Sequence, residues 1–563
     1  MREPVDLIRD TEFFCELEES ALEEMAKACQ YIELSRGSVL FREAEKAESF
    51  YILAYGRLGV WSGRRRIGEV HPMECVGEVA LLRDGNRTAT VKAERDCLLL
   101  QLTKASFNAL LENHPKAMLK VTLKVTDRLA GSYVQQKKPP QSIAIVPMTA
   151  HPEFEKFCRS LQESMSKFHP TFLALPSDKL PGMDWFAKVE SDNGTVLYQC
   201  RTGLCPWSER CLRQADRVMV VGVEAEPKAP GVHEQYWNSL LKRESKLLLI
   251  LFGFGKAKKA SKWLKHRKNV QVHHLEWNKK PDRIARFINR KAFGLVLGGG
   301  GARGLAHVGV FKALEERGIK PDLVGGTSMG GFCAALLASG RSAAEIERDL
   351  RWTWINAGPF FDYNLPLYSI IKGDRVRGRL VRLFGRRHIE DLDIPFFCMT
   401  ADITNAQSIC HNRGLIYRWL AVGMSIPGVA PPYPHKGRLL LDGGLLNNLP
   451  VDVASEFGCG EILAINVDPK EEMAIQDQDF DGTLSKQLWR KLTGTTTAPS
   501  IFEVLVRVTS LSNAAAIERM RHLIDHYVQP NTDTFGLFDF HQIDDIIQSG
   551  YDAMMAYKFS HED

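Results

Sequence analysis

Short alternations of apolar and polar residues fill the first part of the chain. After a helical pattern at 17–29, apolar runs of strand length follow one another, separated by single glycines. This spacing is typical of a small antiparallel β-roll or barrel. A second helical pattern covers 104–133, and the charged, proline-containing stretch QQKKPPQ after it indicates a linker. We therefore predict a β-roll domain with flanking helices at 1–135 and a linker at 136–141.

The pattern changes at Ser142, where longer apolar runs alternate with stretches of helical period. The runs are SIAIVP (142–147), TFLALP (171–176), RVMVVGV (217–223) and KLLLILF (246–252). Such alternation predicts a parallel sheet covered by helices. A new α/β pattern starts near Phe293 with GLVLGGGG. We predict a multidomain protein with an α/β middle domain at 142–290, a second α/β domain with a mostly parallel sheet at 291–475, and a helical extension at 476–563.

Composition narrows the class of protein without identifying it. The chain has 563 residues, of which 44% are hydrophobic and 25% charged, and its formal charge of +5 is too small to indicate a nucleic-acid partner. Twelve cysteines without a CxxC pair favour neither a disulfide framework nor a metal site, and they fit a reducing, cytoplasmic setting. The sequence shows no signal peptide and no apolar run of about 18 residues, so a soluble or peripheral protein is expected.

The strongest chemical signal is a serine framed by glycines after a short apolar run. Residues Gly326-Thr327-Ser328-Met329-Gly330 satisfy G-x-S-x-G directly after Leu323-Val324. The two glycines allow a sharp turn from strand to helix that projects the serine towards a substrate carbonyl. The apolar run after the motif supplies the helix, whose amino-terminal end favours negative charge beside Ser328.

A glycine loop lies upstream of this serine. Its members are Gly298, Gly299, Gly300, Gly301, Ala302, Arg303 and Gly304. The loop also fits a dinucleotide-binding fingerprint, with Asp322 as the acid, but Asp322 precedes its strand whereas a ribose-binding acid follows it. Beside a nucleophile, successive backbone N–H groups can instead stabilise an oxyanion, so Gly299, Gly300, Gly301, Arg303 and Gly304 are predicted to form the oxyanion hole. Arg303 can orient the loop, meet a phosphate of the substrate, or simply face water.

An acid follows a third apolar strand, at Asp442-Gly443-Gly444. A carboxylate at this place can take the serine proton directly if burial raises its pKa. In the common hydrolase order a histidine follows, and His522, His526 and His541 are available in the sequence. None of the three stands at a strand end or between glycines, so a dyad of Ser328 and Asp442 is preferred.

These three elements, in this order, resemble the patatin-like phospholipase family. The matching motifs are G-G-G-x-R-G at 299–304, G-x-S-x-G at 326–330 and D-G-G at 442–444, and the segment SIPG at 425–428 also resembles the family's connecting region. The resemblance covers about 293–470. It implies a serine acyl hydrolase in which Ser328 is the nucleophile, Asp442 the base and no metal is used.

The stretch GEVALLRDGNRTATV begins at Gly77 and suits a ligand that carries hydroxyls and a phosphate, because Glu78 and Arg87 flank a turn. Residues 10–135 resemble a cyclic nucleotide-binding domain. The resemblance implies that Glu78 binds the ribose, that Arg87 binds the cyclic phosphate and that Thr88 or Thr90 lies near the base. Ala44 and Asn86 depart from the family, where glycine and proline are common, and the choice between cAMP and cGMP stays open.

The middle segment 195–223 has no catalytic signature of its own, but its place between the two modules resembles the neuropathy target esterase branch of the patatin-like proteins. That likeness implies lysophospholipase activity, within the phospholipase activity of the wider family, without a cofactor for catalysis. The fusion of the two modules predicts that a cyclic nucleotide, cAMP or cGMP, regulates the enzyme. Two alternatives are an acyltransferase using the same dyad and a catalytically inactive, nucleotide-responsive scaffold. Lysines at 256–268, interleaved with Trp263 and Leu264, form either an amphipathic surface for peripheral contact with anionic lipid or a solvated helix face.

Overall fold

The computed structural model divides into two compact units, 1–252 with 266–282 and 253–265 with 283–563, which we describe separately. The residues whose structure is described are 3–11, 14–15, 17–63, 65–77, 85–114, 142–223, 229–240, 247–252, 260–267, 270–276, 279–356, 362–365, 369–469, 513 and 515–559. The predicted linker at 136–141, Glu78 and the stretch 476–512 lie outside them. The predicted division into domains stays a prediction.

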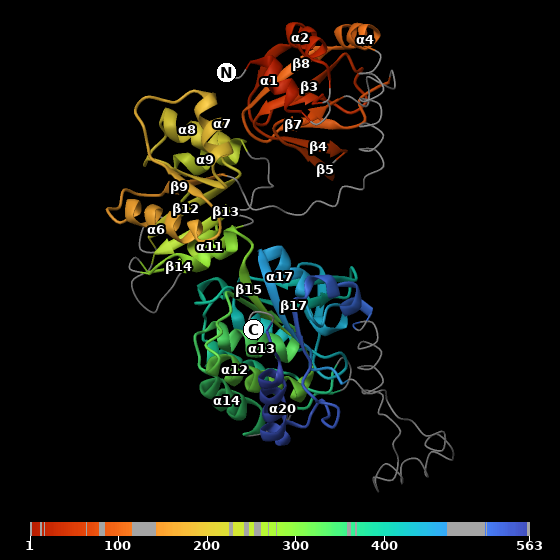
Figure 1. Ribbon diagram of the computed structural model, residues 1–563. Helices are drawn as coiled ribbons and strands as arrows, with labels where there is room; N and C mark the ends of the chain where they lie inside the picture. Colours follow the sequence, from red (N-terminus) through yellow and green to blue (C-terminus); the bar gives the residue numbers. More distant parts are fainter. Residues whose placement is uncertain are drawn as a thin grey trace. The chain divides into compact units, whose positions relative to one another are not determined.

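The first part of unit 1 is an antiparallel β-roll with flanking helices, as predicted (Figure 1). One sheet has the strand order β1-β8-β3-β6 and the other β2-β7-β4-β5. Its elements are α1 (Pro4–Arg9), α2 (Glu19–Ala28), β1 (Gln30–Leu34), β2 (Val39–Phe41), β3 (Ser49–Tyr55), β4 (Leu58–Ser62), β5 (Arg65–Val70), β6 (Cys75–Val76), β7 (Thr90–Ala93), β8 (Cys97–Thr103) and α4 (Lys104–Asn113). Apolar residues of alternate strand positions, such as Leu53, Leu58 and Leu99, fill its core.

The second part of unit 1 is a parallel sheet in the order β10-β11-β9-β12-β13-β14. Its elements are β9 (Ser142–Pro147), α6 (Phe154–Ser166), β10 (Thr171–Ala174), α7 (Met183–Asp192), β11 (Thr195–Gln199), α8 (Pro206–Gln214), β12 (Arg217–Val223), α9 (Val232–Leu240), β13 (Leu247–Phe252) and β14 (Val270–Leu275). The four predicted apolar runs are strands. The strands β11 and β14 were not foreseen, because their sequences contain polar residues.

Unit 2 contains the second α/β fold. Its elements are α10 (Ser261–Leu264), α11 (Asp282–Ile288), β15 (Ala292–Leu297), α12 (Ala306–Glu316), β16 (Leu323–Gly326), α13 (Ser328–Ala338), α14 (Ala343–Leu350), α15 (Asp374–Phe384), β17 (Phe396–Asp402), β18 (Gln407–His411), α16 (Ile416–Gly423), β19 (Tyr433–His435), β20 (Arg438–Asp442), α17 (Val451–Phe457), β21 (Cys459–Ile465), β22 (His526–Val528) and α20 (Ile543–Ala556). The sheet order is β19-β20-β17-β16-β15-β21-β22, with β18 beside β17, and the strands from β17 through β22 in this order are parallel.

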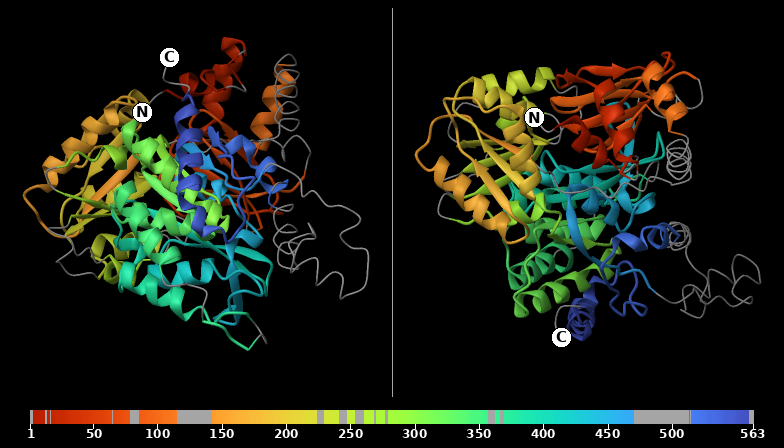
Figure 2. Two further views of the ribbon diagram at one scale, coloured as in Figure 1. Left: turned by 90° about the horizontal axis from the view of Figure 1, so that it is seen from below. Right: turned by 45° about the horizontal axis from the view of Figure 1, so that its top comes forward.

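The predicted helical extension is part of this fold. Strand β22 joins the sheet edge beside β21, so the extension is not only helical. Helix α20 packs along α12, dark blue beside green in Figure 1 and Figure 2. Gly309 and Gly550 meet at this crossing, where a Cβ on either would collide with the backbone of the other helix. The C-terminal segment therefore stabilises the elements that carry the glycine loop.

In the described part of the lysine-rich segment, 260–267, the predicted apolar residues do not face solvent. Trp263 is 0% exposed and Leu264 is 8% exposed. The backbone N–H of Ala260, just before α10, donates to the Asp391 carboxylate at 2.8 Å. The alternative in which Trp263 and Leu264 contact lipid is therefore wrong, because both side chains belong to the core.

Candidate active site

Ser328 lies at the first residue of α13, directly after the end of β16 and Thr327. Its φ of 53° is in the left-handed region, which is rare for a residue with a side chain and typical of a strained nucleophile turn. The two glycines of the G-x-S-x-G motif explain how this turn fits against the neighbouring strand. A Cβ at Gly326 or at Gly330 would collide with the Leu297 carbonyl oxygen of β15. The turn can therefore form against the neighbouring strand only with glycine at both positions.

Asp442 ends β20 and lies beside this serine. In the sheet register Gly326 pairs with Cys398, and Asp442 pairs with Thr400 two residues further along β17. The Ser328 hydroxyl donates to Asp442 Oδ2 at 2.6 Å, and the Gly444 N–H donates to Oδ1 at 2.8 Å. The structure thus brings together two residues that are 114 positions apart in the sequence.

The electrostatic environment of Asp442 favours proton uptake. The residue is only 6% exposed, and no ion pair joins it to any residue that the structure describes. Burial raises the pKa of Asp442 to about 6, although the hydrogen bonds from Ser328 and Gly444 partly oppose this. A carboxylate with this pKa is ionised near neutral pH and can still hold a proton during a reaction.

No histidine takes the place of this acid within the described part of unit 2. His526 contacts Glu461 at 2.7 Å, His522 contacts the Arg519 carbonyl oxygen, and His541 lies in a 3₁₀ turn before α20. A further histidine, His307, is completely buried, and its Nε2 lies 2.8 Å from the Gly298 carbonyl oxygen. Burial lowers the pKa of His307 to about 4, so this ring is neutral and donates to the glycine loop.

The glycine loop lies directly against the nucleophile. A Cβ at Gly299 would lie 2.9 Å from the Ser328 Cβ. The N–H of Gly299 donates to Asn448 Oδ1 at 3.2 Å, and its carbonyl oxygen accepts from Asn448 Nδ2 at 3.1 Å. The amide of Gly299 is therefore occupied within the protein.

Gly300 and Gly301, the next two residues of the loop, differ from Gly299 in their backbone hydrogen bonds. Among the described residues, no acceptor is found for the N–H groups of Gly300 and Gly301. Ala302 donates to the Leu537 carbonyl oxygen at 2.8 Å, and the N–H of Arg303 donates to the Gly300 carbonyl oxygen at 3.2 Å. The N–H groups of Gly299 and Arg303 are thus occupied within the protein, and those of Gly300 and Gly301 remain candidates for the predicted oxyanion hole.

The remaining predicted residues of the loop and of the acid motif pack around the site. Arg303 is 6% exposed, so it does not simply face water. A Cβ at Gly304 would collide with the Met329 side chain, and one at Gly443 would collide with Met399. Gly444 contributes its N–H to Asp442. These positions shape the site through close packing.

Sequence reasoning missed Asn448 and Leu537. Asn448 also donates to Asp468 at 3.0 Å, so it joins the glycine loop to the end of β21. The pair Asn447-Asn448 stands shortly after the D-G-G motif in the sequence, and that proximity was the available signal. Leu537 carried no signal, because it acts through its backbone carbonyl.

The predicted nucleotide residues of the β-roll are partly brought together. Arg87 is 5% exposed, and its guanidinium donates to the carbonyl oxygens of Gly77 at 3.1 Å and Ser49 at 2.5 Å. Thr88 is exposed, whereas Thr90 accepts from the Glu43 N–H. The position of Glu78 lies outside the described residues.

Ala44, one of the departures from the cyclic nucleotide-binding pattern, has a φ of 69°. Its N–H donates to the Arg87 carbonyl oxygen at 2.9 Å, so the turn contacts the backbone of the predicted phosphate ligand. A left-handed conformation is favourable for glycine and strained for alanine, which explains why glycine is common there.

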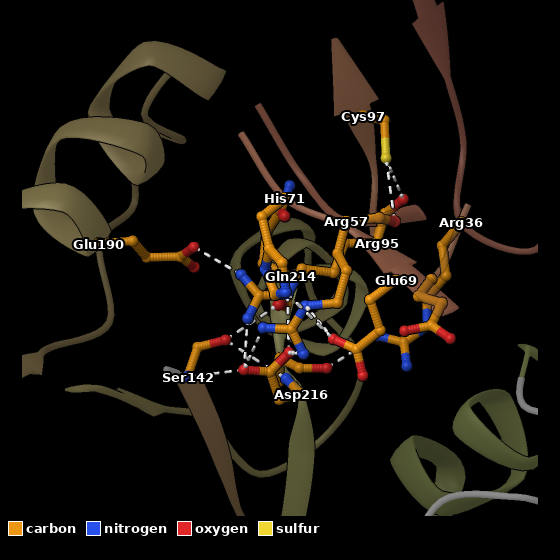
Figure 3. A network of polar contacts seen from close by, with 12 residues as sticks. Arg36, Arg57, Glu69, His71, Arg95, Cys97, Ser142, Glu190, Gln214 and Asp216 are labelled. Carbon is orange, nitrogen blue, oxygen red and sulfur yellow. Dashed lines mark hydrogen bonds and ion pairs between the residues drawn. The ribbon is translucent and has the colours of Figure 1, made fainter. Parts of the chain in front are cut away.

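A second cluster of buried charge lies between the β-roll and the parallel sheet of unit 1 (Figure 3). Arg95, from the turn before β8, donates to Asp216 at 2.8 Å and to Glu190 at 2.6 Å. Arg57 pairs with Asp216 at 2.7 Å, and Tyr198 donates to Glu190 at 2.6 Å. Burial opposes the charge of Asp216, but attraction to Arg95 and Arg57 outweighs it and lowers the pKa of Asp216 below its usual value.

Three segments of the chain match known protein families. Residues 295–455 match the patatin-like phospholipase family, 31–114 match the cyclic nucleotide-binding domain, and 140–293 match the P-loop like domain of the neuropathy target esterase family. In fold and site the chain is thus similar to multidomain patatin-like proteins. The loop after β9, MTAHPE, nevertheless lacks the glycines and the lysine of a phosphate-binding loop.

Similar proteins include two from animals. Patatin-like phospholipase domain-containing protein 6 of Mus musculus is 29% identical over 94% of this chain and 45% of its own length. Neuropathy target esterase sws of Drosophila melanogaster is 30% identical over 94% of this chain and 43% of its own length. This chain therefore aligns with them over nearly its whole length and spans less than half of theirs.

Among solved structures, the regulatory domain of Toxoplasma gondii PKA with cAMP is 30% identical, with a TM-score of 0.19 over 19% of this chain and 43% of that chain. Within the described residues of this chain, no helix has the length and apolar character needed to cross a membrane.

Proposed function

We propose that this protein is a serine acyl hydrolase that cleaves fatty acyl esters of lysophospholipids or phospholipids. The observation that carries the proposal is the 2.6 Å hydrogen bond from the Ser328 hydroxyl to the buried, uncompensated carboxylate of Asp442, beside a loop with two available N–H groups. The match of 295–455 to the patatin-like phospholipase family supports the same chemistry. In this proposal Ser328 is the nucleophile, Asp442 the base, and Gly300 and Gly301 the oxyanion donors.

The geometry supports a two-step reaction. The Ser328 oxygen attacks the acyl carbonyl carbon while Asp442 takes its proton, and the N–H groups of Gly300 and Gly301 stabilise the oxyanion. The intermediate then collapses, the glycerol oxygen leaves with the proton from Asp442, and an acyl-Ser328 ester remains. Water attacks this ester with Asp442 again as base, and the fatty acid leaves as the proton returns to Ser328.

The test is hydrolysis of lysophosphatidylcholine by the full chain and by two variants, Ser328→Ala and Asp442→Asn. Each variant is expected to lower kcat by about 10³-fold or more, as loss of a nucleophile or its base does in other serine hydrolases. Ser339→Ala is the matched control, because Ser339 follows the same helix and its hydroxyl donates to the Ala335 carbonyl oxygen. A fluorophosphonate probe that labels a control hydrolase but not Ser328 would contradict the proposal.

The same assay separates the alternatives. Adding glycerol or a lysolipid acceptor distinguishes an acyltransferase, which would form an acylated acceptor instead of free fatty acid. A scaffold without catalytic activity would show neither product and no probe labelling. The uncompensated charge of Asp442 favours an enzyme over a scaffold, because an inactive fold gains nothing from it.

We further propose that a cyclic nucleotide, cAMP or cGMP, binds the β-roll with its phosphate at Arg87 and regulates the esterase. The buried guanidinium of Arg87, its contact with Gly77 and the family match of 31–114 support this. Calorimetry of the full chain with each nucleotide tests it, and Arg87→Ala is expected to abolish the heat of binding. No heat with either nucleotide would contradict the proposal.

A further inference from the structure

Unit 2 exposes large apolar side chains on a loop connected to the candidate active site. Tyr363 is 63% exposed, Leu365 is 70% exposed and Ile370 is 50% exposed. We call these three residues the apolar tip. Single exposed apolar residues are common on protein surfaces, but three within one short loop mark a surface that contacts another apolar phase.

The two described sides of this loop, 362–365 and 369–372, are joined by backbone hydrogen bonds. Asn364 donates to the Ile370 carbonyl oxygen at 2.8 Å, and Lys372 donates to the Asp362 carbonyl oxygen at 2.8 Å, so the two sides of the loop are tied together. Ile371 is only 4% exposed, while its neighbour Ile370 points outward. Ile370 is therefore exposed although the backbone on both sides of it is fixed by hydrogen bonds.

The anchor reaches the candidate active site. Ile370 donates to the Gly428 carbonyl oxygen at 3.0 Å and Ile371 to that of Val429 at 2.9 Å. In the same segment, the Ser425 carbonyl oxygen accepts the N–H of Asp442 at 3.0 Å. A short stretch of chain thus connects the apolar tip to the proposed catalytic base.

The sequence directly after the tip is strongly basic. Between 372 and 387 the basic residues are Lys372, Arg375, Arg377, Arg379, Arg382, Arg386 and Arg387, and Asp374 is the acidic residue. Asp374 pairs with Arg377 at 2.9 Å, and Asp393 pairs with Arg387 at 3.7 Å. Lys372, two residues after Ile370, is exposed, and Arg382 and Arg386 further along the same segment are exposed as well, so positive charge remains at the surface of 372–387.

We propose that the apolar tip and the exposed basic residues of 372–387 form the surface by which this protein docks on an anionic phospholipid membrane. Aromatic and aliphatic side chains enter the boundary between headgroups and acyl chains, and nearby lysines and arginines attract anionic headgroups. The occupant is a lipid surface because exposed apolar residues and an exposed cation, Ile370 and Lys372, stand next to one another in the chain and a strongly basic segment follows, as that boundary requires. The inference deepens the proposed function, since it gives the lipid substrate a route to Ser328.

Docking is tested apart from catalysis in the full chain that carries Ser328→Ala. Flotation with vesicles of phosphatidylcholine containing about one third phosphatidylserine is compared with flotation using phosphatidylcholine alone. The double change Leu365→Ser with Ile370→Ser is expected to weaken vesicle binding about tenfold or more, because each substitution removes apolar area that the bound protein buries in the membrane. Lys372→Glu with Arg386→Glu is expected to remove the preference for phosphatidylserine.

Controls distinguish docking from folding and from catalysis. Met555→Ser changes a residue of α20 that is 41% exposed and outside the tip, and it is expected to bind vesicles like the parent. Melting temperature, and turnover of a water-soluble short-chain ester with Ser328 restored, report whether each variant folds. Vesicle binding by the tip variant equal to that of the parent would overturn the proposal. Vesicle binding by a chain that hydrolyses no ester would support docking and contradict the proposed function.

Discussion

Two buried carboxylates, one in each unit, differ in whether positive charge compensates them. Asp216 in unit 1 and Asp442 in unit 2 are both nearly inaccessible, with exposed fractions of 7% for the Asp216 side chain and 6% for Asp442. Asp216 contacts two arginines, Arg95 and Arg57, whereas Asp442 contacts a hydroxyl and a backbone N–H. The pKa of Asp216 is lowered below its usual value, and that of Asp442 is raised to about 6.

The surroundings of each buried carboxylate determine its role. Taking an ion out of water is costly, and Asp216 is compensated by two arginines of the β-roll, so this ion-pair cluster joins the β-roll to the parallel sheet. Leaving the charge uncompensated costs stability but gives a group that exchanges a proton near neutral pH. Asp216 therefore acts in folding and Asp442 in the proposed chemistry, and experiments that remove either partner should separate the two roles.

The largest expected effect on stability follows from Arg95→Met. This change leaves Asp216 and Glu190 buried with less compensation, and the free energy of unfolding of unit 1 is expected to fall by about 3–5 kcal/mol. Hydrogen exchange measures this as faster exchange in β9 and β12, with β15 and β16 unchanged.

The control for this prediction is Arg159→Met, which breaks the exposed pair of Arg159 with Glu155 and is expected to cost less than about 1 kcal/mol. The double change Arg95→Met with Asp216→Asn should be less destabilising than Arg95→Met alone, because the unpaired charge is gone. Equal exchange in Arg95→Met and the parent would mean that the arginine contributes no net stability.

The second prediction concerns the stability of unit 2. Since the pKa of Asp442 is raised in the folded state, ionisation disfavours folding, and this cost grows as pH rises from about 4 through about 6. A rise from the usual value of 3.8 to about 6 corresponds to about 3 kcal/mol at pH 8. Asp442→Asn is therefore expected to stabilise unit 2 by up to this amount at pH 8 while it abolishes turnover.

Urea unfolding of Asp442→Asn and the parent at pH 4 and pH 8 measures this difference. The stabilisation should shrink towards zero at pH 4, where the folded aspartate is protonated and the unfolded one is partly protonated. The pH dependence of stability at Asp216 has the opposite sign. Because the pKa of Asp216 is lowered in the folded state, its ionised form stabilises the fold at pH values above the pKa of an unfolded aspartate, and this stabilisation is lost only as the pH falls below that value. An Asp442→Asn protein that is less stable than the parent at both values of pH would contradict the interpretation of Asp442 as uncompensated.

Local motifs allowed much of this to be predicted from the sequence. The glycine loop and Ser328 follow β15 and β16, and neighbouring parallel strands place their carboxyl ends at one edge, so the proximity of the loop to the nucleophile was foreseeable. Asp442 ends β20, which is antiparallel to β17, so this rule does not place it, and the D-G-G motif of the family carried that prediction. The β-roll and the sheet that follows it were indicated by the change in apolar period at Ser142.

Contacts between distant residues could not be predicted in this way. Arg95 and Asp216 are 121 positions apart, and neither stands in a motif. The occupation of the Gly299 amide by Asn448 depends on a fold that joins residues 149 positions apart. Trp263 was misjudged as a surface residue because a lysine-rich neighbourhood indicates solvent, whereas tertiary packing decided its burial.

The smallest predicted effect is the pH dependence of turnover, and it tests Asp442 most directly. The proposed base must be ionised, so kcat/KM for a soluble ester is expected to fall about tenfold per pH unit below about 6, the pKa of Asp442. The buried His307 titrates about two pH units lower, because burial lowers its pKa to about 4. Measuring the profile at two temperatures identifies the group, since a carboxyl ionises with little enthalpy and an imidazole with much more. An acidic limb that moves with temperature as an imidazole does would show that a histidine supplies the base, and the contrast between Asp442 and Asp216 would then lose its chemical meaning.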